Sequence, residues 1–365
     1  MTDSRLSFQP DWISPPGDTV ADLLEERGWS QSELAARLGY TTKHVCLLLN
    51  GKASITEDTA VRLERVLGST TEFWLTREAQ FRAQKARLES VAQYGAWTDW
   101  LKKLPLKELM KSKAIPTRRI VPRESNSLVE DLLRFFGVAS PEEWEGHYVA
   151  MEGSFRRSRE EQSDIGAISA WLRQGEIKAE RIDGPKFDRV RFLEALKRIR
   201  GLTVRPPESF EPELRRLCKE SGVVLVLVPA IPRSHVSGVA RWLGPHRALI
   251  QLSLYGKTND RFWFTFFHEA AHILHHGKRE VFLDDPGSQG IDSPEETEAN
   301  RWAGDYLIPP THAKALPLLK SKDAVKKFAK GLDIHPGIVV GRLQHGGLVP
   351  FSQMNDLKVS FRWEQ

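Results

Sequence analysis

Apolar residues recur at helical spacing through the first 70 positions of the chain, and glycines separate the repeats. Between 31 and 38 the order Q-S-E-L-A-A-R-L places its leucines and one alanine on one face, as in an amphipathic helix. Ser30 and Glu33 form a capping box at its start, and Gly39 ends it. The pattern predicts short helices at 20–27, 31–38, 41–50 and 57–67. Short helices joined by a tight glycine-containing turn are typical of a helix-turn-helix.

The spacing of apolar residues changes near residue 206, from a purely helical pattern to a mixture of strand and helix patterns. Further helices are predicted at 72–89, 128–136, 141–148, 165–172 and 187–200. A buried strand at 222–228, a strand at 247–253 and an apolar helix at 262–277 follow. These elements predict an α+β fold with an N-terminal arm at 1–17, an all-α domain at 18–75, a helical connector region at 76–205, a mixed domain at 206–310 and a helical extension at 311–365.

The apolar helix at 262–277 carries His268-Glu269-Ala270-Ala271-His272, an H-E-x-x-H motif. Residues four apart on a helix lie on one face, so both imidazoles can turn towards one ion. Glu269 lies about 100° round the helix, where it can take a proton from an attacking water. The motif also arises by chance. A third ligand is therefore the test, because catalytic zinc usually has three protein ligands.

The segment 293–303, S-P-E-E-T-E-A-N-R-W-A, offers that ligand. Ser293 begins a helix as its N-cap, and Glu296 completes a capping box with it. Glu298 lies further inside the helix, beside alanines small enough for two helices to approach closely. We therefore expect Glu298 to be the third ligand, with Glu295 and Glu296 as the alternatives. Two His and one Glu, with a second Glu as base, form a metallopeptidase constellation.

Two roles near this site stay open at the level of sequence. His276, eight residues after His268, could reach the face of the ion. The group that stabilises the oxyanion could be Arg241, Tyr306 or one of the remaining histidines.

Residues from about 221 to 345 resemble the ImmA/IrrE family of metallo-endopeptidases. The resemblance runs in order through the strand 222–228, S-G-V-A at 237–240, the strand 247–253, F-T-x-x-H-E-x-x-H-x-L-H-H at 264–276 and E-A-N-R-W-A-G-D-Y-L-I-P at 298–309. It implies one zinc ion per chain and cleavage of a regulatory protein. It also implies that His268, His272 and Glu298 are metal ligands and that Glu269 is the catalytic base. Trp302 stands where the family commonly has Phe.

Charge is unevenly distributed over the N-terminal helices. Residues 34–56 contain no Asp or Glu, whereas Arg37, Lys43 and Lys52 are basic, in a segment that is otherwise slightly acidic. Cations gathered on one face suit a surface that contacts phosphates.

The order W-S-Q-S-E-L-A-A-R-L-G-Y-T-T-K-H-V-C-L-L-L-N-G-K at 29–52 resembles phage-repressor helix-turn-helix domains, and among them HigA-type antitoxins most. The resemblance implies that base edges in the major groove face Thr41, Thr42, Lys43 and His44. It implies that phosphates are held by Gln31 and Asn50. The residues of this segment expected in the core are Val45, Leu47, Leu48 and Leu49.

Composition sets further bounds. The 365 residues are 40% hydrophobic and 28% charged, as in an ordinary globular protein. The longest apolar run, near 223–231, is too short to span a bilayer, and the first ten residues do not resemble a signal peptide. Cys46 and Cys218 are too far apart to suggest a disulfide framework. We therefore expect a cytoplasmic protein without membrane contact. A net charge of +5 permits nucleic-acid binding.

Together these features predict a DNA-binding transcriptional regulator fused to a zinc-dependent endopeptidase. Its expected partners are operator DNA, bound as a homodimer, and a toxin or regulatory protein that it cleaves, in a toxin-antitoxin or stress- or phage-type regulatory module. The alternative is a non-proteolytic HigA-like antitoxin that represses its operon and neutralises a toxin, with the peptidase fold used for binding or sensing. Only the enzyme needs Glu269.

Overall fold

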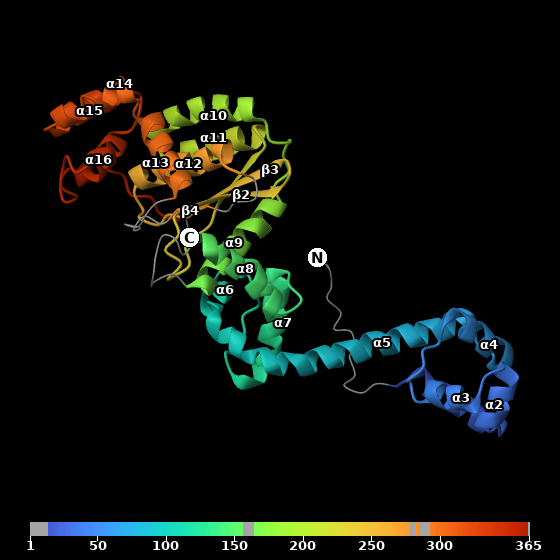
Figure 1. Ribbon diagram of the computed structural model, residues 1–365. Coiled ribbons are helices and arrows are strands. Elements are labelled where there is room, and N and C mark those ends of the chain that lie inside the picture. Colours follow the sequence, from blue (N-terminus) through green and yellow to red (C-terminus); the bar gives the residue numbers. More distant parts are fainter. Residues whose placement is uncertain (1–13, 156–163, 278–281, 285–292, 364–365) are drawn as a thin grey trace. The chain divides into compact units, whose positions relative to one another are not determined.

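The structure is a computed structural model that describes residues 14–155, 164–277, 282–284 and 293–363. The part of the expected N-terminal arm at 1–13 lies outside these residues. The chain divides into two compact units, 1–98 and 99–365 (Figure 1). Every helix in the described part of the chain is either too short or not apolar enough to cross a membrane.

Unit 1 is all-α. Its helices are α1 (Pro16–Arg27), α2 (Gln31–Leu38), α3 (Thr42–Leu49), α4 (Glu57–Leu67) and α5 (Thr71–Tyr94). Local capping sets these boundaries. The Ser30 hydroxyl accepts a hydrogen bond from the Glu33 amide, and the Thr41 hydroxyl accepts one from the His44 amide. Between them Gly39 adopts the left-handed conformation, with φ 71°, that favours glycine. The short helices α2 and α3 with this turn form the predicted helix-turn-helix.

The core of unit 1 confirms most of the expected buried positions. Val45 and Leu48 of α3 are buried, and Leu49 packs against the core from its edge. The expectation that Leu47 lies in the core is wrong, because its side chain is 36% exposed. Leu47 follows Val45 by two positions, about 200° round the helix, so both cannot face the same core. Leu47 therefore joins the exposed face of α3.

Unit 2 contains both helices and strands, and the α+β prediction is confirmed. Its helices are α6 (Leu106–Lys111), α7 (Ser125–Phe136), α8 (Pro141–Phe155), α9 (Ile165–Glu180), α10 (Arg189–Gly201), α11 (Pro207–Glu220), α12 (Asn259–His275), α13 (Pro294–Leu307), α14 (Pro310–Ala313), α15 (Lys322–Gly331) and α16 (Pro336–His345). Short 3-10 helices lie at Gly95–Lys103, Pro122–Glu124, Leu202–Val204, Leu316–Leu318 and Asn355–Leu357. Gly95–Lys103 begins within unit 1.

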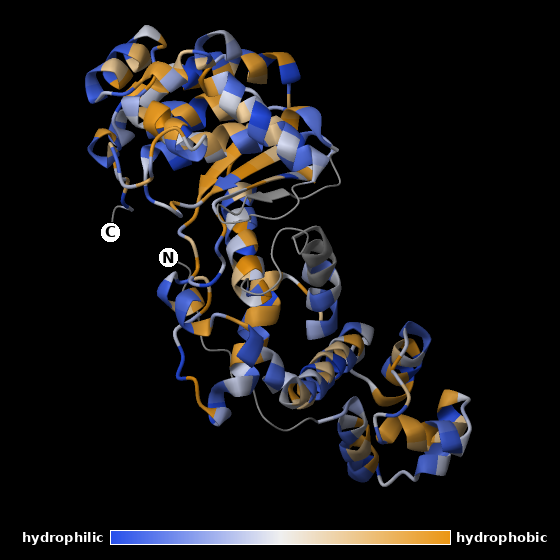
Figure 2. Ribbon diagram, turned by 60° about the vertical axis from the view of Figure 1, so that its left-hand side comes forward, coloured by the Kyte–Doolittle hydropathy of each residue, from blue (hydrophilic) through white to orange (hydrophobic). Residues whose placement is uncertain are grey.

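One sheet lies at the centre of unit 2. Its strands are β1 (Val223–Leu227), β2 (Gly238–Gly244), β3 (Arg247–Leu252) and β4 (Phe282–Asp284), in the order β1-β3-β2-β4. β1 is parallel to β3, whereas β2 is antiparallel to β3 and to β4. Figure 2 shows the strands as a hydrophobic layer, as expected for a sheet buried on both faces.

Helices cover both faces of this sheet (Figure 1). α10, α11 and α12 lie on one side, and Trp263, Phe266 and Phe267 of α12 contribute to the main core. α9 lies on the other side, where the Trp171 indole donates a hydrogen bond to the Val228 carbonyl at 3.1 Å. The Gln251 amide of β3 returns a bond to the Trp171 carbonyl at 2.8 Å. The sheet is thus buried between two helical layers.

α9 approaches the sheet closely at a glycine. A Cβ atom at Gly175 would lie 1.7 Å from Oε1 of Gln251. Nearby, the buried Arg241 of β2 forms an ion pair with Glu176 at 2.6 Å and donates to the Leu172 carbonyl at 2.9 Å. This part of the region expected as a connector at 76–205 is therefore packed on the sheet.

Candidate metal centre and nucleic-acid interface

α12 buries the H-E-x-x-H motif in the interior of unit 2. His268, Glu269 and His272 are 1%, 0% and 2% exposed. Their helix packs on the sheet through its aromatic face and on α13 through small residues, since Ala299 and Ala303 of α13 are fully buried. The expected close approach of two helices at these alanines is confirmed. Two imidazoles and a carboxylate are thereby held in the interior, where polar groups need partners.

The two imidazoles converge on one point, as the i, i+4 spacing predicts. Nε2 of His268 lies 2.9 Å from Nε2 of His272. The Glu296 carboxylate of α13 completes the group, with one oxygen 3.1 Å from Nε2 of His268 and the other 3.4 Å from Nε2 of His272. Within the described residues, these three side chains are the cluster able to hold a metal ion.

The expectation that Glu298 is the third ligand is corrected by this geometry. The carboxylate of Glu298 lies 3.4 Å from Nε2 of His276, and its side chain is 47% exposed. Glu296, one of the two alternatives and also the capping-box residue, is the glutamate that lies beside both histidines. Only its backbone amide takes part in the cap, donating to the Ser293 hydroxyl at 3.3 Å. Its carboxylate therefore remains available to the histidines.

His268 has a second partner that sets its tautomer. Its Nδ1 lies 3.0 Å from Oδ1 of Asn300 on α13. An amide oxygen only accepts hydrogen bonds, so Nδ1 carries the hydrogen and Nε2 presents a lone pair to the cluster. Metal-binding histidines characteristically have such an outer partner, which orients the ring.

The charge states of the cluster suit a cation. Burial lowers the pKa of His272 to about 4, although the Glu296 carboxylate opposes the shift. Burial alone would raise the pKa of Glu296, but the neighbouring His268 and His272 imidazoles lower it to about 2. At neutral pH His272 is therefore neutral and Glu296 is a carboxylate. These are the forms in which the side chains bind metals.

The donor set also fits zinc in its dimensions. The distances between the donor atoms, 2.9, 3.1 and 3.4 Å, approach the edge of about 3.3 Å of a tetrahedron with zinc–ligand bonds of about 2.0–2.1 Å. Lone pairs of two neutral imidazoles and a carboxylate directed at one point repel each other unless a cation lies between them. The residues present therefore fit a three-ligand zinc site with one open position.

Glu269 lies beside this cluster, against strand β2. A Cβ atom at Gly238 would be 2.7 Å from Oε1 of Glu269 and 2.6 Å from Cγ2 of Thr265. A glycine at this position therefore lets the strand approach the carboxylate. Because Thr265 precedes Glu269 by one helical turn, the two side chains form a continuous surface along α12.

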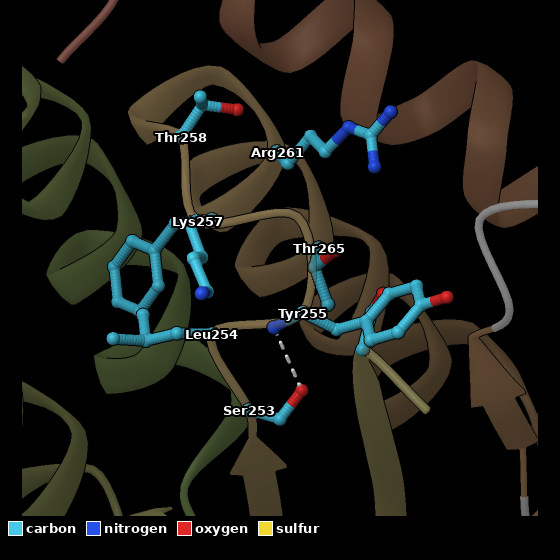
Figure 3. Close-up of a pocket in the computed structure, with 9 residues that line it drawn as sticks. Ser253, Leu254, Tyr255, Lys257, Thr258, Arg261 and Thr265 are labelled. Atoms are coloured by element: carbon cyan, nitrogen blue, oxygen red, sulfur yellow. Dashed lines mark hydrogen bonds between the residues drawn. The ribbon is translucent and has the colours of Figure 1, made fainter. Parts of the chain in front are cut away.

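A small open pocket continues from that surface. Its lining comes from the end of β3, the loop that follows and the first two turns of α12, together with Ser237 next to Gly238. Figure 3 shows the Lys257 side chain directed between Leu254 and Thr265, whereas the Arg261 guanidinium extends away from Thr265. Among the described residues that line the pocket none is acidic. The pocket therefore carries positive charge one helical turn from Glu269, beside Thr265.

The candidates for oxyanion stabilisation lie at different places. Arg241 is on the opposite face of the sheet, paired with Glu176. The ring of Tyr306 stacks on Trp302 at 4.6 Å, and its carbonyl accepts a hydrogen bond from Arg200. His235 contacts the Tyr255 hydroxyl at 3.0 Å, and Tyr255 lines the pocket beside Thr265. Of the three, His235 is thus the candidate in contact with a residue of the pocket.

In unit 1 the exposed face of α3 carries the expected DNA-facing residues. Thr42 and Lys43 are exposed, and the His44 ring packs 4.6 Å from the Tyr40 ring. The Thr41 hydroxyl caps the helix, and the Asn50 side-chain amide donates to the Cys46 carbonyl at 2.7 Å. Gln31 is exposed at the start of α2. Of the four residues expected at base edges, Thr42 and Lys43 are therefore the two whose polar ends are most available.

Known protein families match both parts of the chain. A family profile described as helix-turn-helix matches residues 20–75, and one described as an IrrE N-terminal-like domain matches residues 221–343. The chain joins a DNA-binding helix-turn-helix domain to an IrrE N-terminal-like domain. The IrrE-like domain contains all of the residues of the metal cluster, together with Glu269.

Individual relatives cover smaller parts of the chain. An uncharacterized HTH-type transcriptional regulator, YddM, of Escherichia coli strain K12 is 35% identical over 60 residues, which are 16% of this chain and 64% of that protein. A HigA-family addiction module antidote protein from Coxiella burnetii is 34% identical over 22% of this chain and 89% of its own, with a TM-score of 0.21. The antitoxin GraA is 30% identical over 22% of this chain and 87% of its own, with a TM-score of 0.21.

A signal in the sequence could have identified which glutamate of α13 lies beside the two histidines. Ala299, Ala303 and Leu307 form the buried stripe of α13. Gly304 is buried beside this stripe, and Asn300 and Glu296 precede Gly304 by one and two turns, whereas Glu298 lies about 200° away from Glu296. The capping box drew attention away from Glu296, because that motif assigns a role to the side chains of both Ser293 and Glu296. Here the Ser293 hydroxyl accepts a hydrogen bond from the Glu296 backbone amide, which leaves the carboxylate unused by the cap.

Proposed function

We propose that this protein is a transcriptional regulator whose IrrE-like domain is a zinc-dependent endopeptidase. The observation that carries the proposal is the convergence of His268, His272 and Glu296 on one point, with the buried Glu269 on the same helix. The two histidines would bind zinc through Nε2 and Glu296 through its carboxylate. Asn300 would hold His268 in the tautomer that binding requires.

Glu269 would act as the general base and then the general acid. When bound, zinc would activate water as a nucleophile and polarise the scissile carbonyl. The Glu269 carboxylate would accept a proton from the attacking water and give it to the leaving amine. Burial of Glu269 between α12 and Gly238 holds the carboxylate in one place and excludes bulk water.

The pocket beside Glu269 suggests the class of substrate. Lys257 and Arg261, which border it, would favour an acidic residue near the scissile bond. The chain has its own exposed segment without regular structure at 116–120, P-T-R-R-I, but this segment is basic and is disfavoured by the same charges. We therefore expect cleavage of a partner protein, at an acidic site.

The helix-turn-helix domain would direct the protein to an operator as a homodimer. Two-fold proteins read half-sites about one helical turn of DNA apart. Thr42 and Lys43 would contact base edges with Thr41 and His44, and Gln31 and Asn50 would contact phosphates. Regulation would then come from cleavage of a partner encoded with the protein.

The test is cleavage of that partner by matched variants. Zinc-loaded wild type, Glu269→Gln and Glu208→Gln are each incubated with the product of the adjacent gene, and fragments are identified by mass spectrometry. Glu269→Gln keeps the shape but removes the base, so cleavage should slow by about 10²–10⁴-fold. Glu208→Gln makes the same change at an exposed position of α11 and should cleave as wild type does.

Other outcomes would refute the proposal in different ways. Equal fragments from Glu269→Gln would point to a contaminating protease. If no variant yields fragments and a toxin partner is nevertheless neutralised, the non-proteolytic HigA-like antitoxin is the correct function. Fragments of the chain itself, cut at 116–120, would contradict the acidic preference.

A further inference from the structure

A chain of contacts leads from the outer side of His272 to the surface of unit 2. The Nε2 atom of His272 faces the metal cluster, and its Nδ1 atom lies 2.8 Å from Nδ1 of His276. His276 is the residue that follows α12, and its side chain is buried, at 5% exposure. Its Nε2 atom lies 3.4 Å from a carboxylate oxygen of Glu298. The contacts therefore run from His272 through His276 to Glu298.

One arrangement of hydrogens satisfies every contact in this chain. If Nε2 of His272 presents its lone pair to the cluster, its Nδ1 carries the hydrogen. That hydrogen is donated to Nδ1 of His276, whose own hydrogen is then on Nε2 and is directed at the Glu298 carboxylate. Because the Glu298 carboxylate can only accept, the hydrogen bonds run in one direction, from His272 through His276 to Glu298. Glu298 thereby selects the tautomer of His272 in which Nδ1 carries the hydrogen and Nε2 is free to face the cluster.

His268 also has a partner for its Nδ1 atom, and that partner lies on α13, the helix that carries Glu298. Asn300 of α13 accepts from Nδ1 of His268, as His276 does from His272. α13 therefore supplies the ligand Glu296, the partner Asn300 and the end of the second chain, Glu298. Glu298 contacts His276 and not the two histidines of the cluster, so it lies beside the cluster without being part of it.

We propose that His276 and Glu298 are positioning residues that orient the His272 imidazole for metal binding. The inference rests on the metal site of the proposed function. Partners of this kind keep a ring in place and raise its basicity, and their removal typically weakens metal binding by about 10–100-fold. Neither residue is a ligand in this arrangement, so the coordination geometry is retained when either is replaced.

The experiment measures zinc dissociation constants by competition with a chromophoric chelator. His276→Ala should weaken binding by about 10–100-fold, and Glu298→Gln by a factor in the lower part of that range. His276→Asn places an amide oxygen near the position of Nδ1 and should recover part of the affinity. His275→Ala, the neighbouring histidine that instead faces Trp302, and Asp305→Asn, on α13, are the matched controls and should bind as wild type does.

Two further readouts separate positioning from other roles. The melting temperature of metal-free His276→Ala should equal that of the wild type, because a positioning role acts on the ligand. The visible spectrum of the cobalt-substituted variant should keep the wild-type band positions and intensity. A lower melting temperature that accounts for the lost affinity would make His276 structural. A changed spectrum, or complete loss of cobalt binding, would make His276 a ligand.

The remaining outcomes are also decisive. If His276→Ala and Glu298→Gln bind zinc as tightly as the controls, the positioning role is refuted while the metal site stands. If the wild type itself binds no zinc, both the metal site and the inference fail. The two failures are distinguished by the wild-type measurement alone.

Discussion

Substitution of Gly238 by alanine tests the packing that holds the Glu269 carboxylate. A Cβ atom there would lie 2.6 Å from Cγ2 of Thr265 and 2.7 Å from Oε1 of Glu269, well inside the 3.4 Å at which ordinary contact begins. Both neighbours are buried on α12, so either the strand or Glu269 must move. Overpacking of this kind costs about 1–3 kcal/mol of unfolding free energy. We expect Gly238→Ala to be destabilised by that amount and to cleave its substrate more slowly.

The assay compares Gly238→Ala with Gly244→Ala. Gly244 is in the same strand, and a Cβ atom there would meet nothing within 4 Å. Denaturant unfolding should show the difference, which corresponds to a melting temperature lower by roughly 2–4 °C for each kcal/mol. Zinc affinity should be nearly unchanged, because Gly238 contacts the base and not the ligands. Equal stability of the two variants would refute the close approach of β2 to Glu269.

Two other predictions concern recognition. Thr42→Ala combined with Lys43→Ala should weaken operator binding by about 1–3 kcal/mol for each lost base contact and leave the melting temperature unchanged. If this double variant protects the operator as the wild type does, the assignment of α3 as the recognition helix is wrong. Lys257→Glu should reverse part of the pocket's charge and shift cleavage from acidic to basic sites, as identified from the termini of the fragments. An unchanged site preference would exclude the pocket from substrate binding.

Local signals in the sequence were sufficient for the helix-turn-helix domain. The predicted bounds of α2 and α4 are confirmed residue for residue, because Ser30, Gly39 and Thr56 act on their own neighbours through backbone hydrogen bonds. Capping needs no information from the remainder of the fold. The prediction for Leu47 was wrong because an apolar side chain on this helix can face outwards. In the run Leu47-Leu48-Leu49, hydrophobicity alone does not show which side chain faces the core.

The IrrE-like domain was predictable in part. His268, Glu269 and His272 are placed by helical periodicity within one element, so their mutual arrangement was foreseeable. Which glutamate of α13 lies beside the histidines depends on how α13 is rotated against α12, and that rotation is set by the buried alanines. β4 has three residues, too few for a recognisable alternation. The contact of α9 with the sheet depends on Gly175 meeting Gln251, a pairing between distant segments that no local pattern records.

The most direct test of the account is a crystal structure of the zinc-loaded protein, with anomalous data collected at the zinc absorption edge. The account predicts one anomalous peak per chain, at bond distances of about 2.0–2.2 Å from Nε2 of His268, Nε2 of His272 and the carboxylate of Glu296, with Glu269 outside the bonding shell. A peak bonded to Glu298 in place of Glu296, or the absence of a peak between the two histidines, would contradict it.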